Sequence, residues 1–215
     1  MQNKIIQFIR INRVSTAQVS DALEKTGVIN GVRPITSQIH CVGPVRWIYA
    51  YNESNWDFHD QIRSAQPGEI LLVEAFGCAD RAVFGSLVSK FLILYRQVAA
   101  VIVIGLVRDV HELIKERFPI WSIGITPLGC YNKKVTQPFD AQIIDVRRKQ
   151  YDGSVAVCDD SGATIIPPNA LTSEFLASLQ QMENQEDIWF DCIDRKKWDT
   201  YETICLKRYL IEKNE

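Results

Sequence analysis

The stretch Val98–Glu116, VAAVIVIGLVRDVHELIKE, decides how the rest of this 215-residue sequence is interpreted. It opens with an unbroken apolar run, rich in β-branched residues, which predicts a strand buried on both faces. After Gly105 and Val107 the spacing of apolar residues becomes helical. Arg108 and Asp109 therefore stand where a buried strand gives way to a helix, the position at which open α/β sheets hold their ligands.

Two interpretations of this charged pair remain open at the level of the residues. Asp109 followed by Glu112 is a capping-box pattern, which would satisfy the free N–H groups of the following helix. Arg108 is harder to explain as a cap, because a guanidinium beside a buried strand needs an anion or a carbonyl partner. The capping carboxylate itself could be that partner.

Composition excludes several classes of protein. Apolar residues make up 47% and charged residues 23% of the chain, as in an ordinary soluble domain, and the net charge of −2 argues against a nucleic-acid binder. The N-terminus has no apolar core of a signal peptide, and Arg96 and Gln97 interrupt the longest apolar stretch, so we expect no membrane segment. The six cysteines are widely spaced and are expected to be reduced thiols in a cytoplasmic protein.

Along the chain, helical and extended patterns alternate. Residues 1–14 are predicted to form a short helix or an arm, and helices are predicted at 16–26, 57–65, 87–96 and 172–182. Strands are predicted at 37–51 with a break at Gly43-Pro44, at 69–77, within 118–129, and as a closing pair at 140–147 and 154–166. The segment 184–215 is charged but too aromatic for disorder, and we expect a helical tail that packs on the body or on a neighbouring subunit.

Motif tests exclude the commonest enzyme sites. The chain has no P-loop, no G-x-G-x-x-G and no G-x-S-x-G, and His40, His59 and His111 form no pair with metal-ligand spacing. We expect His59 and His111 to lie on the surface or behind the site. Any metal would thus be held by oxygen ligands, as Mg²⁺ or Mn²⁺ is.

Several segments in order resemble the RraA-like family, which comprises the regulator of ribonuclease activity A and metal-dependent 4-hydroxy-4-methyl-2-oxoglutarate aldolases. They include VSDALEKTG, VGPV, QPGEILLVEAFG, ADRAVFGSLV, VIVIGLVRDVHEL, FPIWSIGITP and DDSGATIIPP, and they cover about residues 15 to 170. The resemblance implies a compact αββα-type sandwich that is not a Rossmann fold, here at 1–183, with the helical tail at 184–215. It also implies homotrimers or hexamers with sites at subunit interfaces.

The resemblance also implies roles for individual residues. Asp109 would hold a divalent cation, Mg²⁺ or Mn²⁺, with Glu112 behind it, and Arg108 would contact a bound 2-keto acid such as pyruvate. The backbone of Gly85, Ser86, Leu87 and Val88 would take the carboxylate of that substrate. The implied activity is that of a lyase on pyruvate-derived 2-keto acids, either an aldolase or an oxaloacetate decarboxylase.

This sequence departs from the aldolase pattern at the glycine loop, which is Gly85 to Val88. Ser86 occupies the position of an acid that serves proton transfer in aldolase members, and the segment from Gly85 to Arg108 carries one extra residue. Aldol cleavage needs a base for the substrate hydroxyl, whereas decarboxylation does not, so we expect decarboxylation to survive better. The alternative is a non-catalytic regulator that binds proteins. A methyltransferase, a label also attached to this family, has no recognisable site here.

Overall fold

The computed structural model describes residues 1–212, which divide into two compact units, Met1–Thr172 and the segment from Ser173 onward. The first unit contains the helices α1 (Gln2–Asn12), α2 (Thr16–Ala22), α3 (Trp56–Gln61), α4 (Ser86–Lys90), α5 (Val110–Lys115) and α6 (Ala141–Tyr151). Its strands are β1 (Arg33–Pro34), β2 (Cys41–Tyr51), β3 (Ile70–Phe76), β4 (Ala82–Phe84), β5 (Ala100–Val107), β6 (Ile120–Ile125), β7 (Val155–Asp159) and β8 (Gly162–Ile166). Short helical turns are η1 (Ile62–Ser64), η2 (Phe91–Tyr95) and η3 (Pro168–Ala170).

One mixed sheet organises the first unit. Its strand order is β1-β6-β5-β3-β2-β7-β8, and β4 pairs with β5. The central strands β2, β3, β5 and β6 are parallel, while β7 and β8 close the sheet as an antiparallel hairpin. This α/β sandwich confirms the fold class predicted from the sequence.

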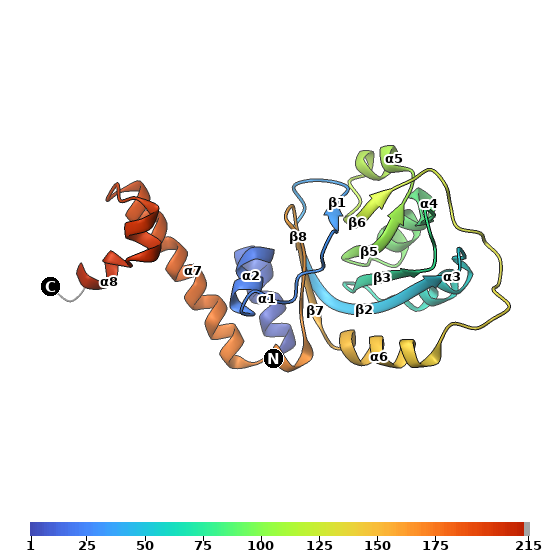
Figure 1. The fold of residues 1–215 in the computed structure, drawn as a ribbon, viewed down its shortest axis with the longest axis horizontal. Coiled ribbons are helices and arrows are strands. Elements are labelled where there is room, and N and C mark those ends of the chain that lie inside the picture. Colours follow the sequence, from blue (N-terminus) through green and yellow to red (C-terminus); the bar gives the residue numbers. More distant parts are fainter. Residues whose placement is uncertain (213–215) are drawn as a thin grey trace. The chain divides into compact units, whose positions relative to one another are not determined.

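The two faces of the sheet carry two separate hydrophobic cores. On β3, Leu71 and Val73 belong to the core that includes residues of α3, α4 and α5, whereas Ile70 and Leu72 belong to the core that includes α6. Successive side chains of a strand point to opposite faces, so a strand buried on both sides must be apolar throughout. Figure 1 shows α6 along one side of the sheet and α4 and α5 toward the other.

The predicted break at Gly43-Pro44 is a change of partner within one continuous strand. Residues Cys41–Pro44 of β2 pair antiparallel with β7, and Val45–Tyr51 pair parallel with β3. A Cβ on Gly43 would collide with the backbone carbonyl of Gly68, so the close approach at this point requires glycine.

The predicted strand at 140–147 is wrong, because these residues form α6. Asp140 caps this helix by accepting a hydrogen bond from the Gln142 N–H at 2.8 Å. Ile144, Arg147 and Tyr151 then share one helical face, and Ile144 and Tyr151 pack into the adjoining core. The cap and this spacing favour a helix over the alternation that a strand requires. The predicted strand at 154–166 is the β7–β8 hairpin.

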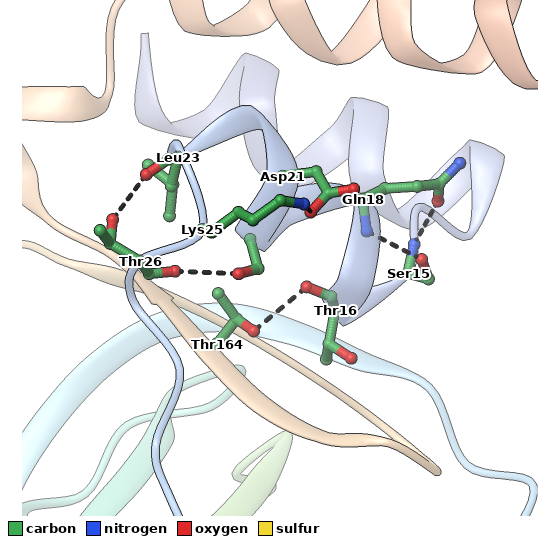
Figure 2. A network of polar contacts seen from close by, with 9 residues as sticks. Ser15, Thr16, Gln18, Asp21, Leu23, Lys25, Thr26 and Thr164 are labelled. Carbon is green, nitrogen blue, oxygen red and sulfur yellow. Dashed lines mark hydrogen bonds and ion pairs between the residues drawn. The ribbon is translucent and has the colours of Figure 1, made fainter. Parts of the chain in front are cut away.

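The helix predicted to end at Gly27 is shorter, since α2 ends at Ala22. It begins with a capping box, in which the Gln18 N–H bonds the Ser15 hydroxyl at 3.1 Å and the Ser15 N–H bonds the Gln18 side chain at 2.7 Å. Figure 2 shows this cap and the Thr164 hydroxyl, which donates to the Thr16 carbonyl at 3.2 Å. These bonds fix the start of α2 against β8.

The helix predicted at 87–96 consists of α4 followed by the π-helical turn η2. In that turn the Arg96 N–H bonds the Phe91 carbonyl at 3.0 Å, five residues back. A π-helical turn holds one more residue than an α-helical turn. The extra residue between Gly85 and Arg108 relative to the family remains a prediction.

The second unit is helical in its described part, as the sequence predicts for the tail. It contains α7 (Ser173–Asp194), the π-helical turn η4 (Tyr201–Cys205) and α8 (Arg208–Glu212). Trp198 lies between Lys196 and Arg208, each with its charged group 4.5 Å from the ring centre. The expected boundary at 183/184 falls inside α7, and the surface on which the tail packs remains a prediction. Among residues 1–212, no helix combines the length and apolarity that a bilayer crossing requires.

Candidate functional site

Two parallel strands deliver the glycine loop and the Arg-Asp pair to the same edge of the sheet. Phe84 of β4 is in register with Val107 of β5, and the Arg108 N–H continues the ladder by bonding the Phe84 carbonyl at 3.0 Å. Gly85 and Arg108 therefore leave their strands side by side. The carboxyl ends of parallel strands are where such folds gather ligand-binding groups.

Asp109 does not use its side chain to cap α5, so the capping-box interpretation is wrong for the carboxylate. The residue occupies the N-cap position with φ 60°, in the left-handed region that aspartate tolerates better than most residues. Its Oδ2 accepts hydrogen bonds from the Ser86 N–H at 2.9 Å and the Ser86 hydroxyl at 3.1 Å. The carboxylate is thus turned toward the glycine loop, and Oδ1 makes no hydrogen bond within residues 1–212.

Two glycines, Gly85 and Gly129, lie against the side chains of Arg108 and Asp109. A Cβ on Gly85 would collide with Asp109 Oδ2 and lie 2.8 Å from Arg108 Cγ. A Cβ on Gly129, in the loop after β6, would lie 2.5 Å from Arg108 Nη1. A side chain at either position would displace Asp109 or Arg108 from its present place, so these two glycines keep both groups where they lie.

The Arg108 side chain is exposed and has no partner within the described residues. Neither a salt bridge nor a side-chain hydrogen bond engages its guanidinium among residues 1–212, although the carboxylate of Asp109 follows it directly in the chain. An unengaged guanidinium presents a planar set of donors that matches a carboxylate or an enolate oxygen.

A hollow of about 120 Å³ brings these groups together. Gly85, Leu87, Val88, Arg108 and Asp109 line it, so five of the residues predicted from the sequence share one cavity. Ser86 reaches the site through its two hydrogen bonds to Asp109.

The start of α4 leaves backbone donors at this hollow. The first intrahelical bond of α4 runs from the Ser89 N–H to the Gly85 carbonyl at 3.1 Å. The N–H groups of Leu87 and Val88 therefore lack intrahelical partners, as at the start of any helix, while that of Ser86 is taken by Asp109.

Glu112 lies apart from the carboxylate of Asp109. Its N–H bonds the Asp109 carbonyl at 2.9 Å, and its own carboxylate is 3.7 Å from the Lys115 ammonium. It lines a neighbouring hollow of about 240 Å³ together with Ser86 and Leu87. A supporting role for Glu112 behind the metal ligand remains a prediction.

The sequence did not indicate Asn55 as a site residue, and it placed His59 only on the surface or behind the site. Asn55 and His59 lie one helical turn apart and both face the hollow, together with Cys130 and Asn132 from the loop after β6. Desolvation by the surrounding residues lowers the pKa of His59. The i, i+4 spacing at the start of a predicted helix was the available signal, but nothing local placed that helix beside β5.

A cation at this site would have one protein carboxylate. Within residues 1–212 no group of three or more His, Cys, Asp or Glu side chains is arranged to hold a metal ion. A single carboxylate suits Mg²⁺ or Mn²⁺, which keep several waters and take further oxygens from the substrate, and it does not suit a structural zinc site.

The mixed sheet and the paired loops define an α/β sandwich protein with an Arg-Asp site at the strand ends. The model of the RraA-like family, described as Aldolase/RraA, matches residues 16–165, and the chain belongs to this family. A protein of Halalkalibacterium halodurans, provisionally named a 4-hydroxy-4-methyl-2-oxoglutarate aldolase, is 27% identical over 177 residues, covering 78% of this chain and 80% of that protein.

Solved structures share the fold. An uncharacterized protein of Pseudomonas syringae has a TM-score of 0.74 at 21% identity, over 95% of this chain and 94% of its own. RraAS2 of Streptomyces coelicolor, from the RNase ES inhibitor RraA protein family, has a TM-score of 0.66 at 21% identity, over 86% of this chain and 95% of its own. The similarity to both therefore extends beyond the family-model match.

Proposed function

We propose that this protein is a divalent-metal-dependent lyase that acts on pyruvate-derived 2-oxo acids. The observation that carries this proposal is that Arg108 and Asp109 line one hollow without being neutralised by each other. The RraA-like fold and the relative provisionally named an aldolase support a carbon–carbon lyase.

Each site residue has a separate task in this proposal. Asp109 would hold the cation, and when bound, the cation would polarise the substrate carbonyl as a Lewis acid. The free N–H groups of Leu87 and Val88 would bind the substrate carboxylate. Arg108 would stabilise the negative charge that develops on the oxygen at C2.

Oxaloacetate decarboxylation places few demands on proton transfer. The C3–C4 bond breaks, carbon dioxide leaves, and the electron pair of that bond forms an enolate whose C2 oxygen Arg108 would hold. C3 then takes a proton from water to give pyruvate. No base is needed before the bond breaks, so the serine at position 86 does not obstruct this reaction.

Aldol cleavage requires the substrate hydroxyl to lose its proton as the C–C bond breaks. Ser86 has a hydroxyl in place of the carboxylate that would accept this proton, and a serine hydroxyl is not a base at neutral pH. This hydroxyl also already donates a hydrogen bond to Asp109. We therefore propose decarboxylation as the stronger activity.

The test is to assay both reactions with the purified protein in Mg²⁺ and in Mn²⁺. Chelation by EDTA should abolish turnover, and readdition of the metal should restore it. Oxaloacetate decarboxylation should exceed cleavage of 4-hydroxy-4-methyl-2-oxoglutarate by about 100-fold or more, the lower end of the range for general acid–base catalysis. Equal rates of the two reactions would refute the explanation that Ser86 limits aldol cleavage. If neither substrate shows metal-dependent turnover, the proposal of a lyase is refuted.

Oligomers are part of the proposal. We propose a homotrimer or hexamer, with the segment from residue 184 packed on the body or on a neighbouring subunit. Light scattering on the whole chain tests the assembly, and a chain ending at residue 183 tests whether the tail contributes to it. A monomer with full activity would refute sites shared between subunits.

A second candidate function is regulation by protein binding. The observation that favours it is the set of exposed apolar side chains in the second unit, which are Phe190, Tyr201, Ile204, Leu206, Leu210 and Ile211. Inhibition of an RNase E-type ribonuclease by both the wild type and Asp109→Asn would support this function, since a binding surface does not need the metal ligand. Inhibition by neither would exclude it for that enzyme.

A further inference from the structure

Asn55 sits at the start of α3 with its backbone fixed on both sides. Its N–H bonds the Tyr131 carbonyl at 3.2 Å, and its carbonyl accepts from the His59 N–H at 3.0 Å. The residue is 7% exposed. The position of its side chain is therefore set by the fold before any ligand binds.

The side chain does not perform the task that asparagine usually has at this position. Asn55 is the N-cap residue of α3, where asparagine commonly accepts a hydrogen bond from the helix, yet no such bond is made. Its amide instead turns toward β4, and Nδ2 donates to the Val83 carbonyl at 2.9 Å. That donor bond fixes which end of the amide is nitrogen, since an oxygen there would face another oxygen.

Oδ1 of Asn55 is left as a buried acceptor without a partner in the described part of the chain. Leaving such a group without a hydrogen bond destabilises the folded protein, because the group has lost its contact with water. Asn55 lines the same hollow as Arg108 and Asp109. A buried, oriented and unpaired acceptor at that place is explained if a bound molecule supplies the donor.

The chemistry of the donor follows from the substrates considered above. The carboxylates and the carbonyl of a 2-oxo acid offer only acceptors at neutral pH, and Arg108 and the loop N–H groups would engage these. A hydroxyl group on the remainder of the substrate is the donor that such a molecule can add.

We propose that Asn55 Oδ1 accepts a hydrogen bond from a substrate hydroxyl, so that the site selects 4-hydroxy-2-oxo acids over their deoxy analogues. This inference rests on the proposed function but concerns affinity, not turnover. An amide is no base, so Asn55 holds the hydroxyl without removing its proton, and tight binding of hydroxy acids is compatible with slow aldol cleavage.

The test is a cycle of two ligands and two proteins. Calorimetry in Mg²⁺ compares 4-hydroxy-2-oxoglutarate with 2-oxoglutarate, which differ by one hydroxyl group. The wild type should bind the hydroxy acid about tenfold more tightly, because one such hydrogen bond and its relief of an unpaired acceptor contribute about 1.4 kcal/mol. Asn55→Leu should bind the two compounds equally, mainly through loss of affinity for the hydroxy acid.

Asn132→Leu is the matched control, because this exposed amide lines the same hollow and should leave the tenfold preference intact. Thermal melting checks that Asn55→Leu folds despite loss of the bond to Val83, and Asn55→Ala serves if it does not. Equal wild-type affinities, or a preference that survives in the Asn55 variants, would overturn the inference alone. If neither compound binds the wild type, the lyase proposal fails together with it.

Discussion

Two of the arginine–carboxylate pairs in the first unit have opposite environments. Glu74 of β3 is 7% exposed, accepts from the Trp47 indole N–H at 2.7 Å and lies 3.0 Å from the Arg147 guanidinium. Arg108 and Asp109 are adjacent in sequence, exposed, and not paired with each other. The charges of the first pair are satisfied by partners within the protein. The second pair lines a hollow, and its guanidinium and Oδ1 have no such partner.

This difference separates structural charges from functional ones better than charge or burial alone. A buried charge needs its partners inside the protein, and Glu74 has them. The open pair is held in place by backbone geometry, through the left-handed Asp109 and the close approach of Gly85. We therefore expect substitutions at the open pair to affect activity, and substitutions at the closed pair to affect stability.

The largest expected effect is that of Asp109→Asn on metal-dependent turnover. Asparagine tolerates the left-handed backbone and still accepts the Ser86 N–H, so the fold is preserved while the charge is lost. Partners of metal ligands typically contribute 10- to 100-fold, so loss of the ligand itself should lower kcat/KM by more than about 100-fold. Steady-state assays and calorimetry with Mg²⁺ measure this.

Asp80→Asn is the control for that variant, because Asp80 is an exposed acid in the loop between β3 and β4 and does not line the hollow. It should retain wild-type kinetics. Unchanged metal binding and turnover in Asp109→Asn would mean that Asp109 only shapes the loop, and the contrast between the two pairs would disappear.

Glu74→Leu should lower the free energy of unfolding by about 2–3 kcal/mol, because it leaves the buried Trp47 N–H without an acceptor and Arg147 without its anion. Urea denaturation measures the loss, and kcat should stay within about threefold at a temperature where the variant is folded. Glu74→Gln is the matched control, since its side-chain oxygen can still accept from Trp47. A variant that is as stable as the wild type but inactive would assign Glu74 to the site.

Each of these two pairs could be predicted from the sequence only if its residues lie close together along the chain. Arg108 and Asp109 follow directly after an apolar strand, so their position at a strand end could be predicted. The Glu74 pair could not, because Arg147 lies on α6, which the sequence pattern assigned to a strand. The cap at Asp140 and the helical spacing of Ile144 and Tyr151 were local signals for α6, and the strand prediction overlooked them.

The same limit applies to the site. Gly85 and Val88 were found because their motif is contiguous, but Asn55 depends on a bond to Val83 across the fold and on the pairing of β4 with β5. No local pattern predicts which asparagine will turn away from its own helix. Recognising such residues requires the three-dimensional arrangement.

Ser86→Asp should sharpen the division of activities at the open pair. The new carboxylate would stand beside Asp109, where the serine hydroxyl is now 3.1 Å from Oδ2, and would supply the missing proton acceptor. We expect aldol cleavage to rise about tenfold, below the full range for general-base catalysis because the acceptor is not optimised, with decarboxylation changed less. Assays of the pyruvate formed from each of the two substrates test this. Ser89→Asp cannot serve as the control, because Ser89 is fully buried. An equal rise in both reactions would mean that the added charge acts through metal affinity.

The smallest effect is expected at Glu112, which belongs to neither extreme. Its backbone N–H bonds the carbonyl of Asp109, but its carboxylate is half-buried and 3.7 Å from the ammonium of Lys115. Glu112→Gln keeps the backbone bond and removes one negative charge from the helix that follows Asp109, so Mg²⁺ affinity should fall by less than about tenfold, the lower limit for partners of metal ligands. Calorimetry measures this, with Glu116→Gln on the same side of α5 as the control. A loss as large as that in Asp109→Asn would make Glu112 a second metal ligand, and the open site would then hold its cation with two carboxylates.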